Sequence, residues 1–115
     1  HKLPNPKRAG NVGSFFQNPL VSDAEAGRLS KLGFQIWEGS AGTKISAAQL
    51  IEQSGLKGQI IGSARVSERH SLVLENTGDA TYQDVVHLMR HVQDTVLQRF
   101  GVSLTPEPHI FSIDL

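Results

Sequence analysis

The sequence predicts an α+β domain in which three helices pack on a small mixed or antiparallel sheet of about four strands. Three segments begin at Ser or Thr and end near Gly, as helices do. Short apolar segments bounded by Gly, Asn and Pro lie before, between and after them and predict strands. Residues 1–115 are enough for one domain with a sizeable core, so we expect a single domain.

The composition argues against several classes of protein. Its 11 basic and 11 acidic residues cancel, whereas a nucleic-acid-binding domain normally has a clear basic excess. No apolar run approaches the ~20 residues of a membrane span, and no secretory signal follows His1. The absence of cysteine fits a reducing, cytoplasmic location and rules out thiolate metal sites. We expect no nucleic-acid and no membrane partner, and a motif already under way at residue 1 predicts a fragment of a longer protein.

The first strand is expected over residues 12–17, after an extended segment over residues 1–11. Phe15 and Phe16 would anchor this strand in the core, and Pro19 would end it because proline has no backbone donor. The element order that follows is helix, loop, helix, two strands, helix and a last strand.

The three helices share one pattern of terminal residues. Each candidate N-cap is followed three positions later by a residue that can bond back to it, as in a capping box, and glycine follows the last turn. The sets are Ser22 and Glu25 with Gly33, Ser46 and Gln49 with Gly55, and Thr81 and Asp84 with Gly101. The third helix also has an apolar stripe at steps of three and four residues. Its members are Val85, Leu88, Met89, Val92, Val96 and Phe100.

The remaining segments predict one loop and three strands. Residues 34–43 are expected to form a mobile loop that carries Trp37, since three of its residues are Gly or Ser. Strands are expected over residues 59–66 and 71–75. A last strand is expected over residues 102–113, and its prolines place it at a sheet edge or in a bent segment.

Ser14 is the first candidate for chemistry. Gly10 and Gly13 precede it and allow a backbone path closed to other residues, so we interpret the stretch as a loop-to-strand element that holds a hydroxyl over a ligand. The alternative is a Gly-rich turn that enters a core strand. The glycines of a nucleophile elbow are missing around Ser14 and no base is evident, but a positioned hydroxyl can still donate a proton.

Other polar residues allow weaker interpretations. Glu107 is held between two prolines and could be aimed rigidly, or could be an ordinary exposed carboxylate. Lys57 lies between glycines after a helix end and suits a phosphate, or simply complements the helix dipole. His87 and His91 lie four residues apart on the third helix, but they lack a third ligand and are expected on a solvated face. We expect no metal site and, because Ser14 opens a strand, no dinucleotide-binding loop.

Several motifs, in order, resemble one family over essentially the whole chain. They are Lys2-Leu3-Pro4-Asn5-Pro6, Gly13-Ser14-Phe15-Phe16-Gln17-Asn18-Pro19, Ala47-Ala48-Gln49-Leu50-Ile51-Glu52 with Gly55-Leu56-Lys57-Gly58, Arg69-His70-Ser71-Leu72-Val73 with Asn76, and Leu104-Thr105-Pro106-Glu107-Pro108. The chain resembles the C-terminal, substrate-binding domain of UDP-N-acetylenolpyruvoylglucosamine reductase, the flavoenzyme that makes UDP-N-acetylmuramate for peptidoglycan.

The resemblance implies that Ser14 protonates the enolpyruvyl substrate as the flavin delivers hydride, and that Glu107 stabilises or protonates the intermediate. It also implies that Lys2, Asn18, Lys57 and His70 line the UDP-sugar site. Trp37 lies near the position of a lid tyrosine in one subfamily and would stack on the substrate.

The resemblance further implies FAD and NADPH as cofactors of the complete enzyme. The family's Gly-rich flavin-binding motifs are missing here, so none is expected to bind this chain alone. The expected partners are UDP-N-acetylglucosamine enolpyruvate and the FAD-binding domain of the same protein. Two alternatives stay open: a stand-alone nucleotide-sugar binding module, and a small hydrolase that uses Ser14.

Overall fold

The computed structural model describes residues 13–107 and confirms the α+β class. The expected site residue Lys2 and the part of the last expected strand beyond Glu107 lie outside the described residues. The helices are α2 (Asp23–Lys31), α3 (Ala47–Gln53) and α4 (Tyr82–Phe100). The strands are β1 (Gly13–Ser14), β2 (Ile36–Gly39), β3 (Gly42–Ile45), β4 (Ile60–Ile61), β5 (Ala64–Val66) and β6 (Val73–Asn76).

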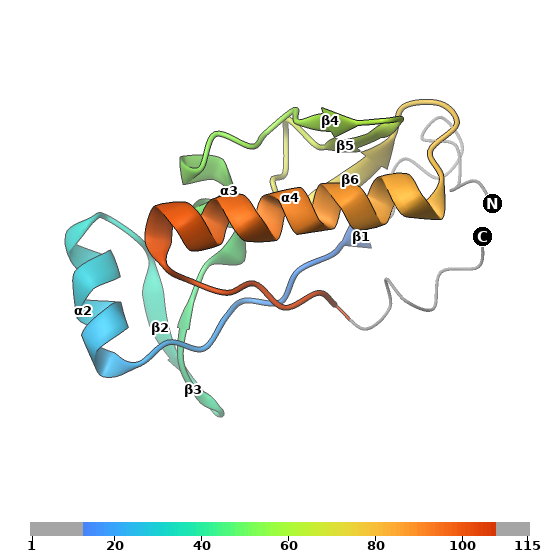
Figure 1. Cartoon of the computed structure of the whole chain (residues 1–115). Coiled ribbons are helices and arrows are strands. Elements are labelled where there is room, and N and C mark those ends of the chain that lie inside the picture. Colours follow the sequence, from blue (N-terminus) through green and yellow to red (C-terminus); the bar gives the residue numbers. More distant parts are fainter. Residues whose placement is uncertain (1–12, 108–115) are drawn as a thin grey trace.

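The strands form two antiparallel sheets. The larger has the order β1-β6-β5-β4, and β2 pairs with β3 in a separate hairpin. Figure 1 shows the long α4 running across the four-stranded sheet, with α2 and the hairpin together at one end of the molecule. All four strands of the larger sheet run antiparallel to their neighbours, and Ser14 is paired with Val73 at its β1 edge.

The helix signals of the sequence are confirmed with one change. Ser22 and Thr81 cap α2 and α4 and form complete capping boxes with Glu25 and Asp84. Ser46 caps α3, but the Gln49 side chain does not return the bond. It accepts a hydrogen bond from the Gln35 N–H and donates one to the Gly33 carbonyl, so it ties α3 to the chain that leaves α2.

The core lies between α4 and one face of the four-stranded sheet, and it continues toward α2 and the hairpin through Leu29, Phe34 and Ile45. Five of the six predicted stripe residues of α4 are buried, and the sixth, Phe100, is half-buried against the Phe34 ring at a centroid distance of 5.0 Å. Alternate sheet residues are buried as well, among them Val66 and Leu74. Their neighbours Arg65 and Glu75 point to the other face, because side chains alternate along a strand. That second face carries the candidate site.

The expected first strand ends at Ser14 rather than at residue 17, and two further expectations for the strands were wrong in detail. Residues 34–43 are not a loop, because β2 and β3 pair through a two-residue turn between Gly39 and Gly42. Gly42 has φ +134°, and this freedom makes a tight turn rather than a mobile segment. Residues 59–66 are two strands, since Gly62 has φ +59° and turns the chain between β4 and β5.

The described part of the last expected strand, residues 102–107, makes only an isolated bridge between Pro106 and Phe16. Backbone hydrogen bonds nevertheless hold it beside the start of the chain: Gln17 N–H donates to Thr105 O at 2.8 Å, and Glu107 N–H donates to Phe15 O at 2.9 Å. Proline at 106 cannot donate, which explains why no longer ladder forms there. Among the described residues, no helix combines the length and apolar character that crossing a membrane requires.

Candidate functional site

A cavity of about 340 Å³ opens beside β1, where residues from four separate parts of the described chain meet. Ser14, Lys57 and His70, three of the predicted site residues, line it together. The other lining residues are Ala48, Glu52, Arg69, Ser71, Leu72 and Val73. The structure thus brings together a hydroxyl, an ammonium and an imidazole that are far apart in the sequence.

Ser14 is fixed by the residues that follow it. Its backbone pairs with Val73 in β6, and the next N–H, that of Phe15, donates to Leu72 O at 3.1 Å. The rings of Phe15 and Phe16 lie in contact at a centroid distance of 4.6 Å, and both are buried. The half-buried Ser14 side chain is therefore held at the cavity wall by a rigid backbone, as a proton donor requires.

Lys57 lies in the loop that leaves α3. Gly55 and Gly58 both have positive φ, and the Gly58 N–H donates to Val66 O at 2.8 Å, so the loop is held against β5. The Lys57 ammonium donates to Glu52 Oε1 at 3.4 Å. Glu52 comes from α3 and lines the same cavity. The ammonium and the carboxylate therefore largely cancel each other's charge at this wall.

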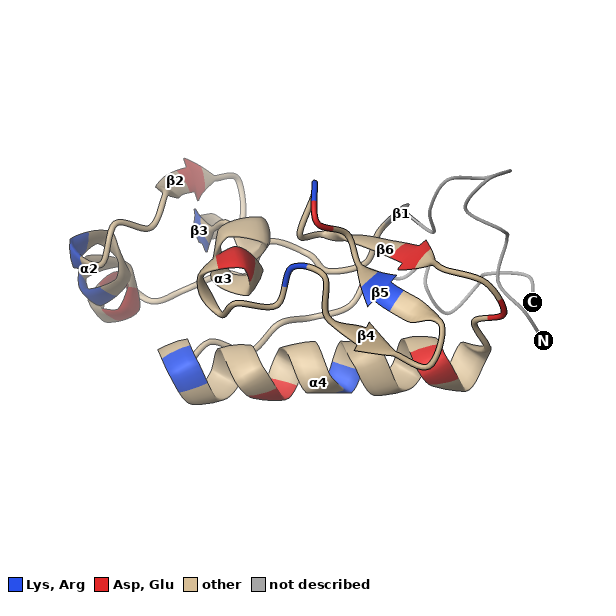
Figure 2. Cartoon of the chain, turned by 90° about the horizontal axis from the view of Figure 1, so that it is seen from above, with Lys and Arg blue, Asp and Glu red and all other residues tan. Residues whose placement is uncertain are grey.

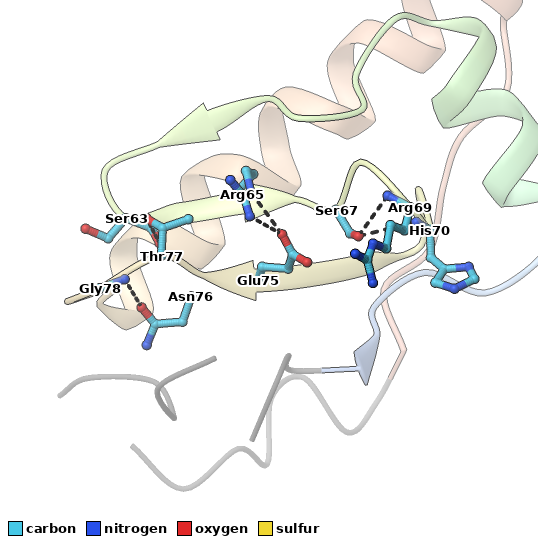
Figure 3. A network of polar contacts seen from close by, with 9 residues as sticks. All are labelled: Ser63, Arg65, Ser67, Arg69, His70, Glu75, Asn76, Thr77 and Gly78. Carbon is cyan, nitrogen blue, oxygen red and sulfur yellow. Dashed lines mark hydrogen bonds and ion pairs between the residues drawn. The ribbon is translucent and has the colours of Figure 1, made fainter. Parts of the chain in front are cut away.

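His70 and Arg69 come from the turn between β5 and β6. Ser67 Oγ accepts hydrogen bonds from the N–H of Arg69 at 3.1 Å and from the N–H of His70 at 3.3 Å. The buried Ser71 Oγ donates to Ala48 O at 2.6 Å and ties the turn to α3. Figure 3 shows the Arg69 and His70 side chains leaving this turn next to each other. Both are exposed at the cavity.

The cavity does not contain an assembled hydrolytic triad. Among the described residues, no hydrogen bond joins the Ser14 hydroxyl to the His70 imidazole, and no carboxylate bonds to that imidazole. Nucleophilic serine catalysis needs such a base beside the hydroxyl. The arrangement instead suits a neutral proton donor beside N–H donors that can hold anionic oxygens.

Glu107 lies near Ser14 along the backbone but does not line its cavity in the described part of the chain. Its N–H bonds to the Phe15 carbonyl, one residue from Ser14, and its side chain is half-buried. Gln17 Nε2 also donates to Pro106 O at 3.1 Å and fixes this segment. The catalytic assignment of Glu107 stays a prediction.

Asn18 has a different environment from the one expected. Its Oδ1 accepts a hydrogen bond at 2.9 Å from the N–H of Ala47, the first residue of α3, and so satisfies a donor that has no partner within the helix. It lines a separate cavity of about 260 Å³ together with Gln17, Pro19, Leu20, Ser103 and Thr105. A role of Asn18 in substrate binding stays a prediction, but its described contact is with the helix that carries Ala48 and Glu52.

Trp37 lies on β2, opposite Lys44 of β3, and is 39% exposed. It is not among the residues that line the Ser14 cavity in the described region. An exposed ring on a two-stranded hairpin can still stack on a ligand, so its role as a substrate contact stays a prediction.

Sequence reasoning gave no role to Arg69 or Glu52, although both line the cavity. The signal in the sequence was their position in the motifs. Arg69 directly precedes the expected site residue His70, and Glu52 ends the motif that comes before Lys57. The structure adds that Arg69 and His70 share one hydroxyl anchor in Ser67. Within residues 13–107, no group of three or more His, Asp or Glu side chains could hold a metal ion.

Comparisons with known proteins agree with the motifs. The family model described as UDP-N-acetylenolpyruvoylglucosamine reductase, C-terminal domain, matches residues 5–111. Reductases of that name from Shewanella sp. (strain MR-4) and Burkholderia vietnamiensis are each 44% identical to the chain, over 97% and 93% of it. The one from Yersinia pestis is 43% identical over 92% of it. The chain spans only about a third of the length of these relatives, 34%, 32% and 32% respectively.

A solved structure is also similar to the chain. It is the UDP-N-acetylenolpyruvylglucosamine reductase from Thermus caldophilus, with 30% sequence identity, 73% of this chain and 32% of that one covered, and a TM-score of 0.44.

Proposed function

Since the chain belongs to the family of UDP-N-acetylenolpyruvoylglucosamine reductase C-terminal domains, we propose that it is the substrate-binding and proton-donating domain of a reductase with that activity. The complete enzyme would convert UDP-N-acetylenolpyruvoylglucosamine to UDP-N-acetylmuramate in the cytoplasm, for peptidoglycan synthesis. The meeting of Ser14 with Lys57 and His70 in one cavity is the observation that carries this proposal.

The described residues do not fit a flavin site. A dinucleotide is usually held where a glycine-rich loop opens a helix, but α2, α3 and α4 each begin at a Ser or Thr cap whose own side chain takes up a free amide. We therefore assign FAD and NADPH to the remainder of a longer protein, where they would supply the hydride. The residues of this chain would bind and orient the substrate and deliver the proton.

Ser14 is proposed as the proton donor. Reduction of the enolpyruvyl double bond leaves one carbon with negative charge that extends into the neighbouring carboxylate, and that carbon takes a proton. A hydroxyl is a weak acid, so its value lies in its fixed position at the cavity wall. The alkoxide that remains after the transfer would be stabilised by the N–H donors of the same cavity. Glu107, one backbone hydrogen bond from Phe15, is proposed to assist at the same carbon.

Ser14→Ala in the full-length protein tests the proposal. We expect kcat to fall about 10²–10⁴-fold, the usual contribution of a positioned acid, while the Kd for UDP-N-acetylglucosamine changes little. Steady-state kinetics and isothermal titration calorimetry measure the two quantities. Ser30→Ala, which removes an exposed hydroxyl from α2, is the matched control and should leave both unchanged. A Ser14→Ala enzyme with kcat within a few-fold of the parent would refute the role.

A further inference from the structure

Some of the charged side chains at the wall of the Ser14 cavity form an ion pair with each other, and one does not. Lys57 donates to Glu52 at 3.4 Å, and the two side chains are 33% and 52% exposed. An ion pair of this kind has almost no net charge to offer a ligand at a distance. Without another positively charged group, the cavity would attract anions only weakly.

Arg69 is that other group. Its backbone is held by Ser67 Oγ, while its guanidinium makes no ion pair with any residue in the described part of the chain. Two other arginines provide a contrast. Arg65 bonds to Glu75 Oε1 through two nitrogens, at 2.9 and 2.7 Å, and Arg28 donates to Phe100 O at 2.6 Å. Figure 3 shows the Arg65–Glu75 pair on the same sheet as the turn that presents Arg69.

We propose that Arg69 anchors the anionic oxygens of the substrate in the Ser14 cavity. The inference rests on the proposed function and adds to it a residue that the motifs did not assign. A guanidinium presents several N–H donors in one plane and pairs with phosphate or carboxylate oxygens through two bonds. The two hydrogen bonds to Ser67 Oγ hold the Arg69 backbone in place. Less conformational entropy is therefore lost when Arg69 binds a ligand.

Arg69→Gln in the full-length protein tests the inference. We expect the Kd for UDP-N-acetylglucosamine, the KM for the enolpyruvyl substrate, or both to rise at least about tenfold, as loss of a charge-assisted hydrogen bond does. The kcat should change much less, because the contact is the same before and during the reaction. Arg69→Lys should restore part of the loss, since it keeps the charge but not the paired donors.

The two ligands identify which oxygens Arg69 binds. Equal weakening for both would place Arg69 at the diphosphate, which both ligands carry. Weakening for the enolpyruvyl substrate alone would place it at the carboxylate, which only that substrate carries. Glu52→Gln, which frees Lys57 and removes a negative charge from the cavity, should tighten binding about two- to threefold.

Arg90→Gln is the matched control. It removes one exposed arginine from α4, which covers the opposite face of the sheet, and both constants should stay within about twofold of the parent. Unchanged thermal midpoints would show that the variants are folded. If the parent binds and turns over its ligands but the Kd and KM of Arg69→Gln stay within twofold of the parent values, the role of Arg69 is refuted and the proposed function is not. A parent that neither binds UDP-N-acetylglucosamine nor turns over the enolpyruvyl substrate would overturn the proposed function as well.

Discussion

Ser14 and Trp37 were both expected at the substrate site, but the two ends of the molecule hold them in different ways. Ser14 sits at the edge of a four-stranded sheet that is covered by α4, and the two aromatic residues after it are buried. Trp37 sits on a two-stranded hairpin, with 39% of its surface exposed. The difference teaches that the proposed proton donor is followed directly by buried aromatic residues, whereas the ring of Trp37 lies on the exposed side of its hairpin and can adjust to a ligand.

Phe15→Ala should have the largest effect on folding at the Ser14 end. Phe15 has no exposed surface and contacts the Phe16 ring, so its loss should lower the free energy of unfolding by about 3–5 kcal/mol. Trp37→Ala at the hairpin end should cost less than about 1 kcal/mol. Urea unfolding followed by circular dichroism measures both. Equal losses would show that the hairpin is as integral to the core as β1 and would remove the contrast.

Gly62→Ala should have the next largest effect, because the turn between β4 and β5 holds the sheet against α4. Gly62 has φ +59°, and a Cβ there would overlap the Asp84 carboxylate. We expect a loss of about 2–3 kcal/mol in the free energy of unfolding. Gly27→Ala is the matched control, since nothing lies within 4 Å of the added Cβ in α2. It should stabilise the chain by up to about 1 kcal/mol. Similar losses for both variants would contradict this account.

Asp84 should contribute a smaller, pH-dependent effect at the same junction. Its carboxylate accepts from the Thr81 N–H at 3.1 Å and from the Ser63 N–H at 3.3 Å, and the first of these bonds is the main cause that lowers the pKa of Asp84 from 3.8. A lowered folded-state pKa gives stability that is present above pH 3.8 and is lost as the pH falls through the folded value.

The measurement compares Asp84→Asn with the parent. At neutral pH the variant should be less stable by up to about 1 kcal/mol, as expected for the loss of a charge at a helix N-terminus. This difference in the free energy of unfolding should disappear as the pH falls below 3.8. Unfolding in urea across that range gives the difference directly. A gap that stays constant with pH would show that the charge of Asp84 does not matter.

The helices could be predicted because their signals are local. Ser22, Thr81 and the apolar stripe of α4 act within one or two turns, and the structure confirms them. The hairpins were missed for a related reason. Gly62 and Gly42 are turn residues, and only a pairing partner decides whether a glycine makes a tight turn or a loose loop. Gln49 shows the same limit, since its side chain bonds to Gln35 and Gly33 rather than to its own cap.

The site could be predicted in part, through resemblance and not through spacing. Nothing in the sequence places Lys57 and His70 beside Ser14, because the meeting depends on β6 lying next to β1. No local sequence pattern shows that Lys57 pairs with Glu52 while the Arg69 guanidinium makes no ion pair in the described part of the chain. Both depend on the tertiary structure. Figure 2 shows why charge counting could not find them: over residues 13–107, acidic and basic residues are interspersed, with no single basic stripe.

The pairing of residues 15–17 with residues 105–107 has a consequence for biosynthesis. Gln17 and Pro106 are joined by a hydrogen bond between positions 89 residues apart, and two backbone bonds lie beside it. The ribosome releases residues 15–17 before residues 105–107, so this flank of Ser14 gains its partner only after the later segment has emerged. A nascent or prematurely terminated polypeptide that stops before Thr105 therefore carries the Ser14 hydroxyl without the three hydrogen bonds that fix the residues next to it.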